Sequence, residues 1–275
     1  MTIWDSIILG IVEGLTEFLP VSSTGHLTIV SKMLGLKIDD PSITGFTAVI
    51  QVGAIVAVVL YFWKDIVRII GAWAGGLAKP ERRTEFDYRM GWYVIVGSLP
   101  IGIIGFLAKD LISGPLRSLW WVAGALIAWS VVMVAAERLS SKARPLTRMT
   151  FLDALTMGLV QCLALIPGVS RSGATISAGL FRGLDRVAAT RISFLLGIPA
   201  LVGAGVYELK DALGGGVGAV SLLVGTVVSF VVAYASIAWL LRFVAKHSIE
   251  LFAFYRVLLG VILLMLLSTS TISPT

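Results

Sequence analysis

The feature that most constrains this chain is a series of long apolar segments spread over its whole length. An α-helix needs about 20 predominantly apolar residues to cross the hydrocarbon core of a bilayer. The sequence therefore predicts an all-α polytopic membrane protein, with residues 1–275 in a single membrane domain. Six segments are expected to span the membrane: residues 43–63, 88–108, 118–137, 192–208, 217–241 and 250–267.

The composition supports a membrane protein and argues against other classes. Hydrophobic residues make up 57% of the chain and charged residues only 14%, whereas about 25% is usual for soluble domains. A net charge of +6 could suggest nucleic acid, but the basic residues lie in short loops between the expected spans. The lipid bilayer is the expected partner, and no nucleic acid is. The single Cys162 excludes an internal disulfide.

Two further apolar segments, at about residues 3–30 and 151–181, are each interrupted midway by a proline and a run of serine, threonine and glycine. Such a break frees backbone groups that hydrocarbon cannot hydrogen-bond, so the break must be buried in protein or face water. Both segments are therefore predicted to be re-entrant helical hairpins, each entering and leaving the membrane on one side.

The two interrupted segments also form an internal repeat, because an offset of 148 residues aligns them without a gap. Three expected spans separate the hairpins, so the second must open on the opposite side from the first. The sequence predicts an inverted repeat, with repeat 1 at about 1–140 and repeat 2 at about 150–268. The aligned pairs include Gly10 with Gly158, Ser22 with Ser170, Gly25 with Gly173, Glu13 with Gln161 and Thr24 with Ser172.

The basic residues of the loops predict the orientation. Fourteen lysines and arginines fall on the side where the second hairpin opens, and five fall on the other. The positive-inside rule places the richer side in the cytoplasm, so both termini and the mouth of the first hairpin are expected to face outward. The five on the outer side are Lys32, Lys37, Lys109, Arg117 and Lys210.

Three arginines stand outside this count. Arg89 and Arg256 lie near the starts of expected spans, where snorkelling of the side chain to the interface is the favoured interpretation. Arg171 lies inside the second break and is not explained in that way.

The first break carries two carboxylates. Glu13 and Glu17 are four residues apart and share one helix face. Each costs about 2.5–3.5 kcal/mol at a membrane centre, and the preceding apolar residues carry them roughly 15 Å inward. They are interpreted as a catalytic acid/base pair or a cation site. The alternative is a pair at the interface that faces water.

The residues after each proline suit an anion. Residues 21–25 can present free N–H groups and hydroxyls at a helix start, which is a typical phosphate site. The second break repeats this pattern and adds Arg171, whose guanidinium can bind phosphate with two parallel hydrogen bonds. Either run alone could be a turn, but together they predict a phosphate site. Its expected lining is Ser22, Thr24, Ser170, Ser172 and Thr175.

A hydroxyl and a histidine complete the first break. Ser23 and His26 are three residues apart, so His26 could act as general base, general acid or nucleophile. A structural histidine is the alternative.

At these residues the sequence resembles the undecaprenyl-diphosphate phosphatase family, also called bacitracin-resistance proteins. The segment from Glu13 to His26 is similar to the glutamate-rich motif of the family, and the segment from Pro167 to Thr175 to its PGxSRSxxT motif. The similarity extends over nearly the whole chain, including residues 51–54 and 254–256.

The resemblance implies a phosphatase of the bacterial cytoplasmic membrane that hydrolyses the diphosphate of a polyprenyl lipid carrier to the monophosphate, with the site opening outward. It also implies an interdigitated inverted-repeat fold and a divalent cation, magnesium or calcium, for which Glu13 and Glu17 are the tentative ligands. Ser23 and His26 both remain candidates for the nucleophile. Glu13, Glu17, Ser23, His26 and Arg171 are the expected catalytic residues.

A transporter or flippase of a polyprenyl phosphate is the alternative function, because broken helices in inverted repeats are also typical of transporters. The hydroxyl beside a histidine favours the enzyme. A homodimer is left open.

Overall fold

The computed structural model describes residues 1–37, 40–108, 118–212 and 217–274. Within these ranges the chain is helical apart from turns, connections and an isolated bridge between Arg144 and Leu184, which confirms the predicted all-α class. Lys109 and Arg117 of the loop count lie outside the described residues, as does the side chain of Lys210.

Six helices are long and apolar enough to cross a membrane, as predicted. The first of them, α3 (Pro41–Tyr61), begins where the carboxylate of Asp40 accepts the backbone N–H of Ser42, and a proline occupies its first turn. The fourth begins about six residues earlier than expected, so Arg191 is helical and not in a loop. The six are α3 (Pro41–Tyr61), α5 (Phe86–Leu107), α7 (Leu119–Leu139), α10 (Arg186–Ala212), α11 (Ala219–Val244) and α12 (Glu250–Ser268).

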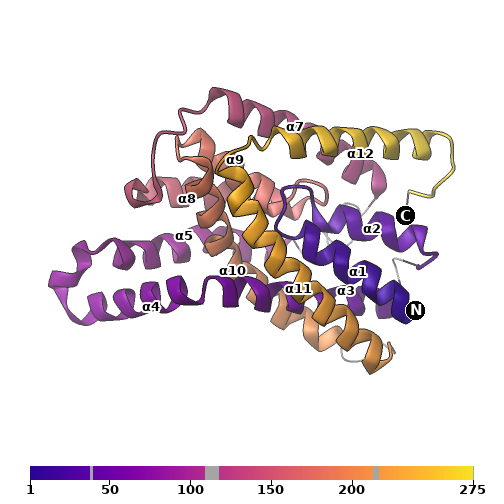
Figure 1. The fold of residues 1–275 in the computed structure, drawn as a ribbon, viewed down its shortest axis with the longest axis horizontal. Coiled ribbons are helices and arrows are strands. Elements are labelled where there is room, and N and C mark those ends of the chain that lie inside the picture. The colour runs from indigo at the N-terminus through magenta and orange to yellow at the C-terminus, as the bar shows by residue number, and fades with distance from the viewer. Residues whose placement is uncertain (38–39, 109–117, 213–216, 275) are drawn as a thin grey trace.

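One helix was missed by the sequence analysis, α4 (Trp63–Ala78), which runs antiparallel to α5 in Figure 1. Its charged residues near the start lower the local hydropathy, and hydropathy alone therefore indicates a loop. The close packing on α5 uses glycines: a methyl group added to Gly76 would meet the Tyr88 ring at 2.2 Å. Helix α4 lies outside the two broken hairpins, and the predicted spans on either side of it are present in the structure.

Both interrupted segments are helix–break–helix units, made of α1 (Ile3–Thr16) with α2 (Ser23–Met33) and α8 (Phe151–Gln161) with α9 (Arg171–Phe181). A short 3₁₀ turn, η4 (Cys162–Leu165), follows α8. Both units begin with the same capping box of threonine and aspartate, and the two boxes are again 148 residues apart in the sequence. The predicted repeat thus extends to the caps of the helices.

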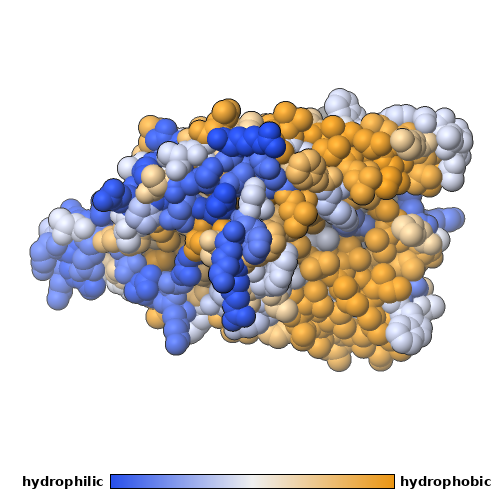
Figure 2. Space-filling view, turned by 45° about the horizontal axis from the view of Figure 1, so that its top comes forward, coloured by the Kyte–Doolittle hydropathy of each residue, from blue (hydrophilic) through white to orange (hydrophobic). Residues whose placement is uncertain are grey.

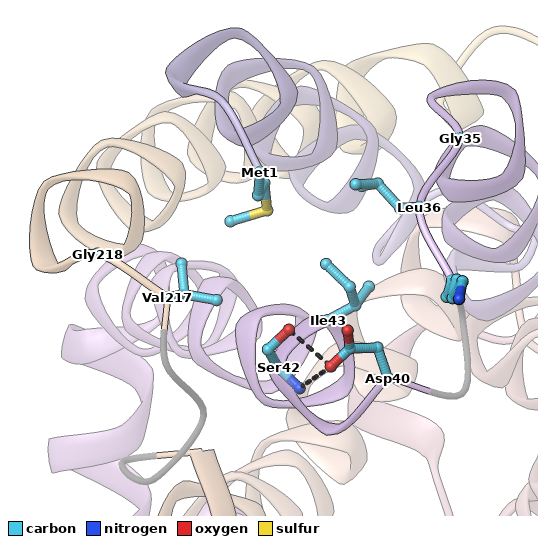
Figure 3. Close-up of a pocket in the computed structure, with 9 residues that line it drawn as sticks. Met1, Gly35, Leu36, Asp40, Ser42, Ile43, Val217 and Gly218 are labelled. Atoms are coloured by element: carbon cyan, nitrogen blue, oxygen red, sulfur yellow. Dashed lines mark hydrogen bonds between the residues drawn. The ribbon is translucent and has the colours of Figure 1, made fainter.

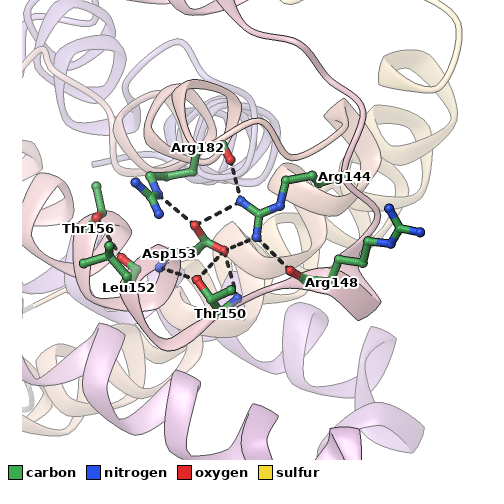
Figure 4. A network of polar contacts seen from close by, with 7 residues as sticks. All are labelled: Arg144, Arg148, Thr150, Leu152, Asp153, Thr156 and Arg182. Carbon is green, nitrogen blue, oxygen red and sulfur yellow. Dashed lines mark hydrogen bonds and ion pairs between the residues drawn. The ribbon is translucent and has the colours of Figure 1, made fainter.

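The second capping box is part of a larger ionic network, shown in Figure 4. The buried carboxylate of Asp153 accepts hydrogen bonds from the hydroxyl and N–H of Thr150. It also pairs with Arg144 at 2.6 Å and Arg182 at 2.7 Å. Because Arg182 directly follows α9, this network ties both ends of the second hairpin together.

The two halves of the chain pack into one another. Helix α1 of the first half packs on α11 of the second, and α8 of the second half packs on α5 of the first. Both contacts are glycine-mediated: a methyl group added to Gly10 would meet the carbonyl oxygen of Gly225 at 2.6 Å, and one on Gly158 that of Gly97 at 2.5 Å. In Figure 1, α1 begins near the end that holds both termini, and α8 lies toward the other end. This arrangement is consistent with the predicted interdigitated, inverted repeat.

The two hairpins differ in burial. Residues 172–180 of α9 are all buried, whereas α2 keeps exposed or half-buried residues along its length. Phe18 of the first break packs edge-on against Phe194 of α10, with ring centroids 5.4 Å apart. Helix α9 is therefore central, and the break of the first hairpin packs on α10. Hydrophilic residues gather toward the end of the molecule opposite the termini (Figure 2).

Candidate active site

The two breaks meet in the folded chain. The hydroxyl of Ser172, in the second break, donates to the backbone carbonyl of Leu19 in the first at 3.1 Å. The guanidinium of Arg171 pairs with the carboxylate of Glu17 at 3.2 Å. Residues more than 150 positions apart in the sequence are thus brought into contact at one place, which we call the tip site. It is formed by residues 17–26 and 167–175.

A carboxylate at the centre of the tip site is held from both sides. Ser23 Oγ donates to Glu17 Oε2 at 2.6 Å, and Arg171 Nη2 donates to Glu17 Oε1 at 3.2 Å. Glu17 is 7% exposed and the side chain of Arg171 is 11% exposed. A carboxylate in contact with a hydroxyl can accept its proton as the oxygen attacks an electrophile.

The local backbone explains how Ser23 and Arg171 both come to contact Glu17. Each is the first residue of its helix, α2 or α9, and each follows a serine with positive φ, 78° at Ser22 and 77° at Ser170. Non-glycine residues rarely adopt this conformation, and here it turns the chain sharply into the new helix. The start of each helix, with its free N–H groups, therefore lies at the tip site.

The guanidinium of Arg171 has hydrogen-bond donors that are not used within the described part of the chain. Nε and Nη1 are buried and make no hydrogen bond within the described part of the chain. The guanidinium lies against Gly197 of α10, where an added methyl group would come within 1.5 Å of Nη1. Buried donors without acceptors are costly, and guanidinium N–H groups are strong donors to phosphate oxygens. The geometry therefore suits an anionic ligand at Arg171.

His26 is not paired with Ser23. Its Nδ1 lies 2.7 Å from the carbonyl oxygen of Ser22, and its Nε2 lies 2.7 Å from the hydroxyl of Tyr255 on α12. A carbonyl can only accept, so Nδ1 carries a proton and, in the neutral ring, Nε2 accepts from Tyr255. Both ring nitrogens are thus engaged, and the hydroxyl of Ser23 is bonded to Glu17. Of the two activating groups expected from the sequence, the structure places the carboxylate next to Ser23.

Of the five predicted lining residues, Thr24 is exposed and the other four are buried: Ser22, Ser170, Ser172 and Thr175. Ser170 Oγ accepts the N–H of Gly173 and lies 3.2 Å from Ser172 Oγ. Thr175 is buried behind Arg171, with its hydroxyl 2.8 Å from the Arg171 carbonyl. Thr24 is different, because it is exposed and among the described contacts only its carbonyl is used, by Thr28.

Arg256 corrects the interpretation from sequence. It is 0% exposed, so snorkelling to the interface is wrong. Its guanidinium donates to the carbonyl of Pro20 at 3.2 Å and to that of Gly168 at 2.9 Å, and to Ser130 Oγ at 3.2 Å. The two breaks leave carbonyls that their own helices do not satisfy, and one buried arginine supplies donors to both.

Sequence reasoning also missed two other contacts of the tip site. Tyr255 binds His26, and Ser193 lies 2.5 Å from the hydroxyl of Thr175. The available signal was the adjacent pair Tyr255 and Arg256 inside an apolar span, where polar residues are functional by default. Ser193 carried no such signal, because a serine is common in spans.

A cation fits the acidic pair only in part. No group of three or more His, Cys, Asp or Glu side chains comes together in the described ranges. Glu13 and Glu17 are both buried, at 2% and 7% exposure, and lie one helical turn apart. Magnesium is commonly held by one or two carboxylates together with substrate phosphates, so the pair fits a cation shared with a phosphorylated ligand.

A separate pocket of about 310 Å³ lies between the start of α1 and the connections that lead into α3 and α11. Figure 3 shows Asp40 at its rim, with the carboxylate bonded to the N–H and hydroxyl of Ser42. None of the predicted site residues lines this pocket, which is distinct from the tip site.

The fold and the tip site together define a polytopic membrane protein with a buried site suited to a phosphorylated ligand. A family model described as bacitracin resistance protein BacA matches residues 6–262. Undecaprenyl-diphosphatase 1 of Streptomyces avermitilis is 57% identical over 99% of both chains. Undecaprenyl-diphosphatase 1 of Streptomyces coelicolor is 58% identical over 99% of this chain and 98% of its own. The undecaprenyl-diphosphatase of Acidothermus cellulolyticus is 54% identical over 98% of each. The chain belongs to the BacA family, as the motifs indicated.

Proposed function

We propose that the protein hydrolyses undecaprenyl diphosphate to undecaprenyl phosphate and inorganic phosphate in the bacterial cell membrane. Full-length relatives with this activity in their names support it. The observation that carries the proposal is the half-buried hydrogen bond between Ser23 Oγ and Glu17 Oε2 at 2.6 Å, beside the unpartnered donors of Arg171. Recycling of the lipid carrier for cell-wall synthesis and resistance to bacitracin follow from this reaction and from the family.

In the proposed first step, Arg171 holds the terminal phosphate and offsets charge that develops in the transition state. Ser23 Oγ forms a bond to the terminal phosphorus while Glu17 takes the hydroxyl proton. The bond from phosphorus to the bridging oxygen breaks, and undecaprenyl phosphate leaves. Glu17 passes its proton to the leaving phosphate and then accepts a proton from water as the water oxygen bonds to the phosphoserine phosphorus. The bond from phosphorus to Ser23 Oγ breaks, Glu17 returns the proton to Ser23 Oγ, and inorganic phosphate is released.

The choice of Ser23 over His26 as nucleophile rests on geometry. Ser23 is 2.6 Å from a carboxylate base, whereas both nitrogens of His26 are engaged by Ser22 and Tyr255. A histidine nucleophile would first have to give up one of these hydrogen bonds.

Trapping of the phosphoenzyme tests this assignment. We expect rapid quenching during turnover of a prenyl diphosphate to yield acid-stable phosphoserine at Ser23, and Ser23→Ala to lose at least about 10³-fold in kcat. Cys162→Ser, outside the tip site, serves as the matched control and is expected to keep wild-type turnover. Acid-labile phosphohistidine at His26 would transfer the nucleophile to that residue.

A divalent cation, magnesium or calcium, remains a proposal. Glu13 and Glu17 are its tentative ligands, because both carboxylates are buried in the first break. The cation would neutralise charge on the diphosphate. The same turnover assay with and without a chelator tests the requirement.

We propose that the tip site opens to the outer face and that both termini lie outside. The excess of lysine and arginine in the loops on the opposite side supports this orientation. In a Cys162→Ser background, a cysteine placed at Thr2 should react with an impermeant maleimide on intact cells, and one at Arg83 should react only after lysis. The reverse pattern would contradict the orientation.

The flippase alternative is less well supported. The same broken helices fit a transporter, but transport does not need a hydroxyl hydrogen-bonded to a buried carboxylate. A homodimer remains a prediction.

A further inference from the structure

Tyr255 is a residue that the proposed chemistry does not use and that nevertheless reaches the tip site. It lies on α12 and is 44% exposed, in line with apolar side chains on the outer face of this helix. Its hydroxyl lies 2.7 Å from Nε2 of His26. The two rings stack with centroids 5.6 Å apart and planes inclined by 16°. Such a contact restricts both the position of the imidazole and its rotation.

His26 in turn holds the backbone that presents Ser23. Nδ1–H of His26 donates to the carbonyl of Ser22 at 2.7 Å, and Ser22 has φ 78° and ψ 98°. A non-glycine residue remains in such a conformation only when its surroundings hold it there. The next residue is Ser23, so a small rotation at Ser22 would move Ser23 Oγ away from Glu17.

The neighbouring residue on α12 acts on the same break. Arg256 donates to the carbonyl of Pro20, two residues before Ser22. Consecutive residues of α12 therefore hold the first break at two points, one through its backbone carbonyl and one through His26. Helix α2 itself packs mainly on α1, and the His26–Tyr255 hydrogen bond is a polar link from it to α12.

We infer that Tyr255 is a positioning residue for phosphoryl transfer, acting through His26 on the Ser22–Ser23 turn. On this view His26 orients the nucleophile and does not attack phosphorus. The inference rests on the proposed function and adds to it a residue outside the two breaks. It predicts that loss of the Tyr255 hydroxyl lowers kcat and leaves KM nearly unchanged, because Arg171 and not Tyr255 contacts the phosphate.

The test is Tyr255→Phe, which removes the hydroxyl and keeps the ring. We expect kcat with undecaprenyl diphosphate to fall about tenfold and KM to change less than twofold. Tyr234→Phe is the matched control, since Tyr234 is an exposed tyrosine of α11 that packs on Tyr61. It is expected to retain wild-type kcat.

A spectroscopic readout distinguishes positioning from general structural support. The chain has two histidines, so the ¹⁵N imidazole spectrum contains His26 and the exposed His247, which His247→Gln assigns. Tyr255→Phe should shift the Nε2 resonance of His26 and leave His247 in place. Wild-type kcat in Tyr255→Phe, or a reduced kcat with an unmoved His26 signal, would overturn the inference.

Failure of the proposed chemistry would look different. If Ser23→Ala remained active, the nucleophile would be wrong whatever Tyr255→Phe does to the His26 signal. If the wild type released no phosphate from any prenyl diphosphate, the function itself would be wrong.

Discussion

Replacing Arg171 with alanine is expected to abolish phosphate release from undecaprenyl diphosphate, with a loss in kcat/KM of at least about 10³-fold. Arg171 is the guanidinium at the tip site with buried donors left over, since Nε and Nη1 make no hydrogen bond in the described part of the chain. Its ionic contact with Glu17 also orients the proposed base. The substitution thus removes phosphate binding and disturbs the carboxylate together.

Two controls make the Arg171 result interpretable. Arg171→Lys keeps the charge but loses the planar fork, and should recover only a small part of the activity. Arg148→Ala removes an exposed arginine from the other end of the second hairpin and should leave turnover unchanged. Phosphate release is measured in detergent, with elution volume as the check of folding. Substantial turnover by folded Arg171→Ala would exclude the phosphate-binding role.

The second large effect is expected for Arg256→Met. Methionine fills a similar volume but leaves the carbonyls of Pro20 and Gly168, and the hydroxyl of Ser130, without their donor. Each unsatisfied buried group costs about 1–3 kcal/mol, so we expect a loss of about 3 kcal/mol or more in unfolding free energy. Because these bonds hold the two breaks together, turnover should fall by at least about 10²-fold even at temperatures where the variant is folded.

The thermal midpoint in detergent and the turnover number measure these two effects separately. Arg89→Met is the matched control, because Arg89 also lies near the start of a span but is exposed. Its midpoint and turnover should match the wild type. An unchanged midpoint in Arg256→Met would mean that the two breaks are held together by other contacts.

The repeat is symmetric in its backbone and asymmetric in its chemistry. The 148-residue offset places Leu165 opposite Glu17 and Arg171 opposite Ser23. Both helix starts have the same turn, with a serine of positive φ. One half therefore carries the acid and the hydroxyl, and the other carries the cation. A second, equivalent site is excluded, because the second half has no counterpart of Glu17 or Ser23.

The membrane spans and the two breaks could be predicted from the sequence, because the free-energy cost of placing a residue in hydrocarbon depends mainly on that residue and its close neighbours in the chain. Apolar runs long enough to span, and prolines that interrupt them, follow from residue-by-residue energies. Glu17, Ser23 and Arg171 were recognisable because polar groups in such segments need a purpose. The amphipathic α4 was not predicted, because the charged residues near its start lower the local hydropathy below that of a membrane span.

The tertiary structure decided which of these groups are partners. Ser23 is three residues from His26 in the sequence but is bonded to Glu17, because the turn at Ser22 points its hydroxyl back toward α1. Arg256 appeared to be a snorkelling side chain and is instead the buried link between the two breaks. Contacts across 150 or more residues depend on how helices pack, and no local energy encodes them. The sequence alone determined the spans, the two breaks and the polar residues within them; packing determined that these breaks meet and which oxygen faces which donor.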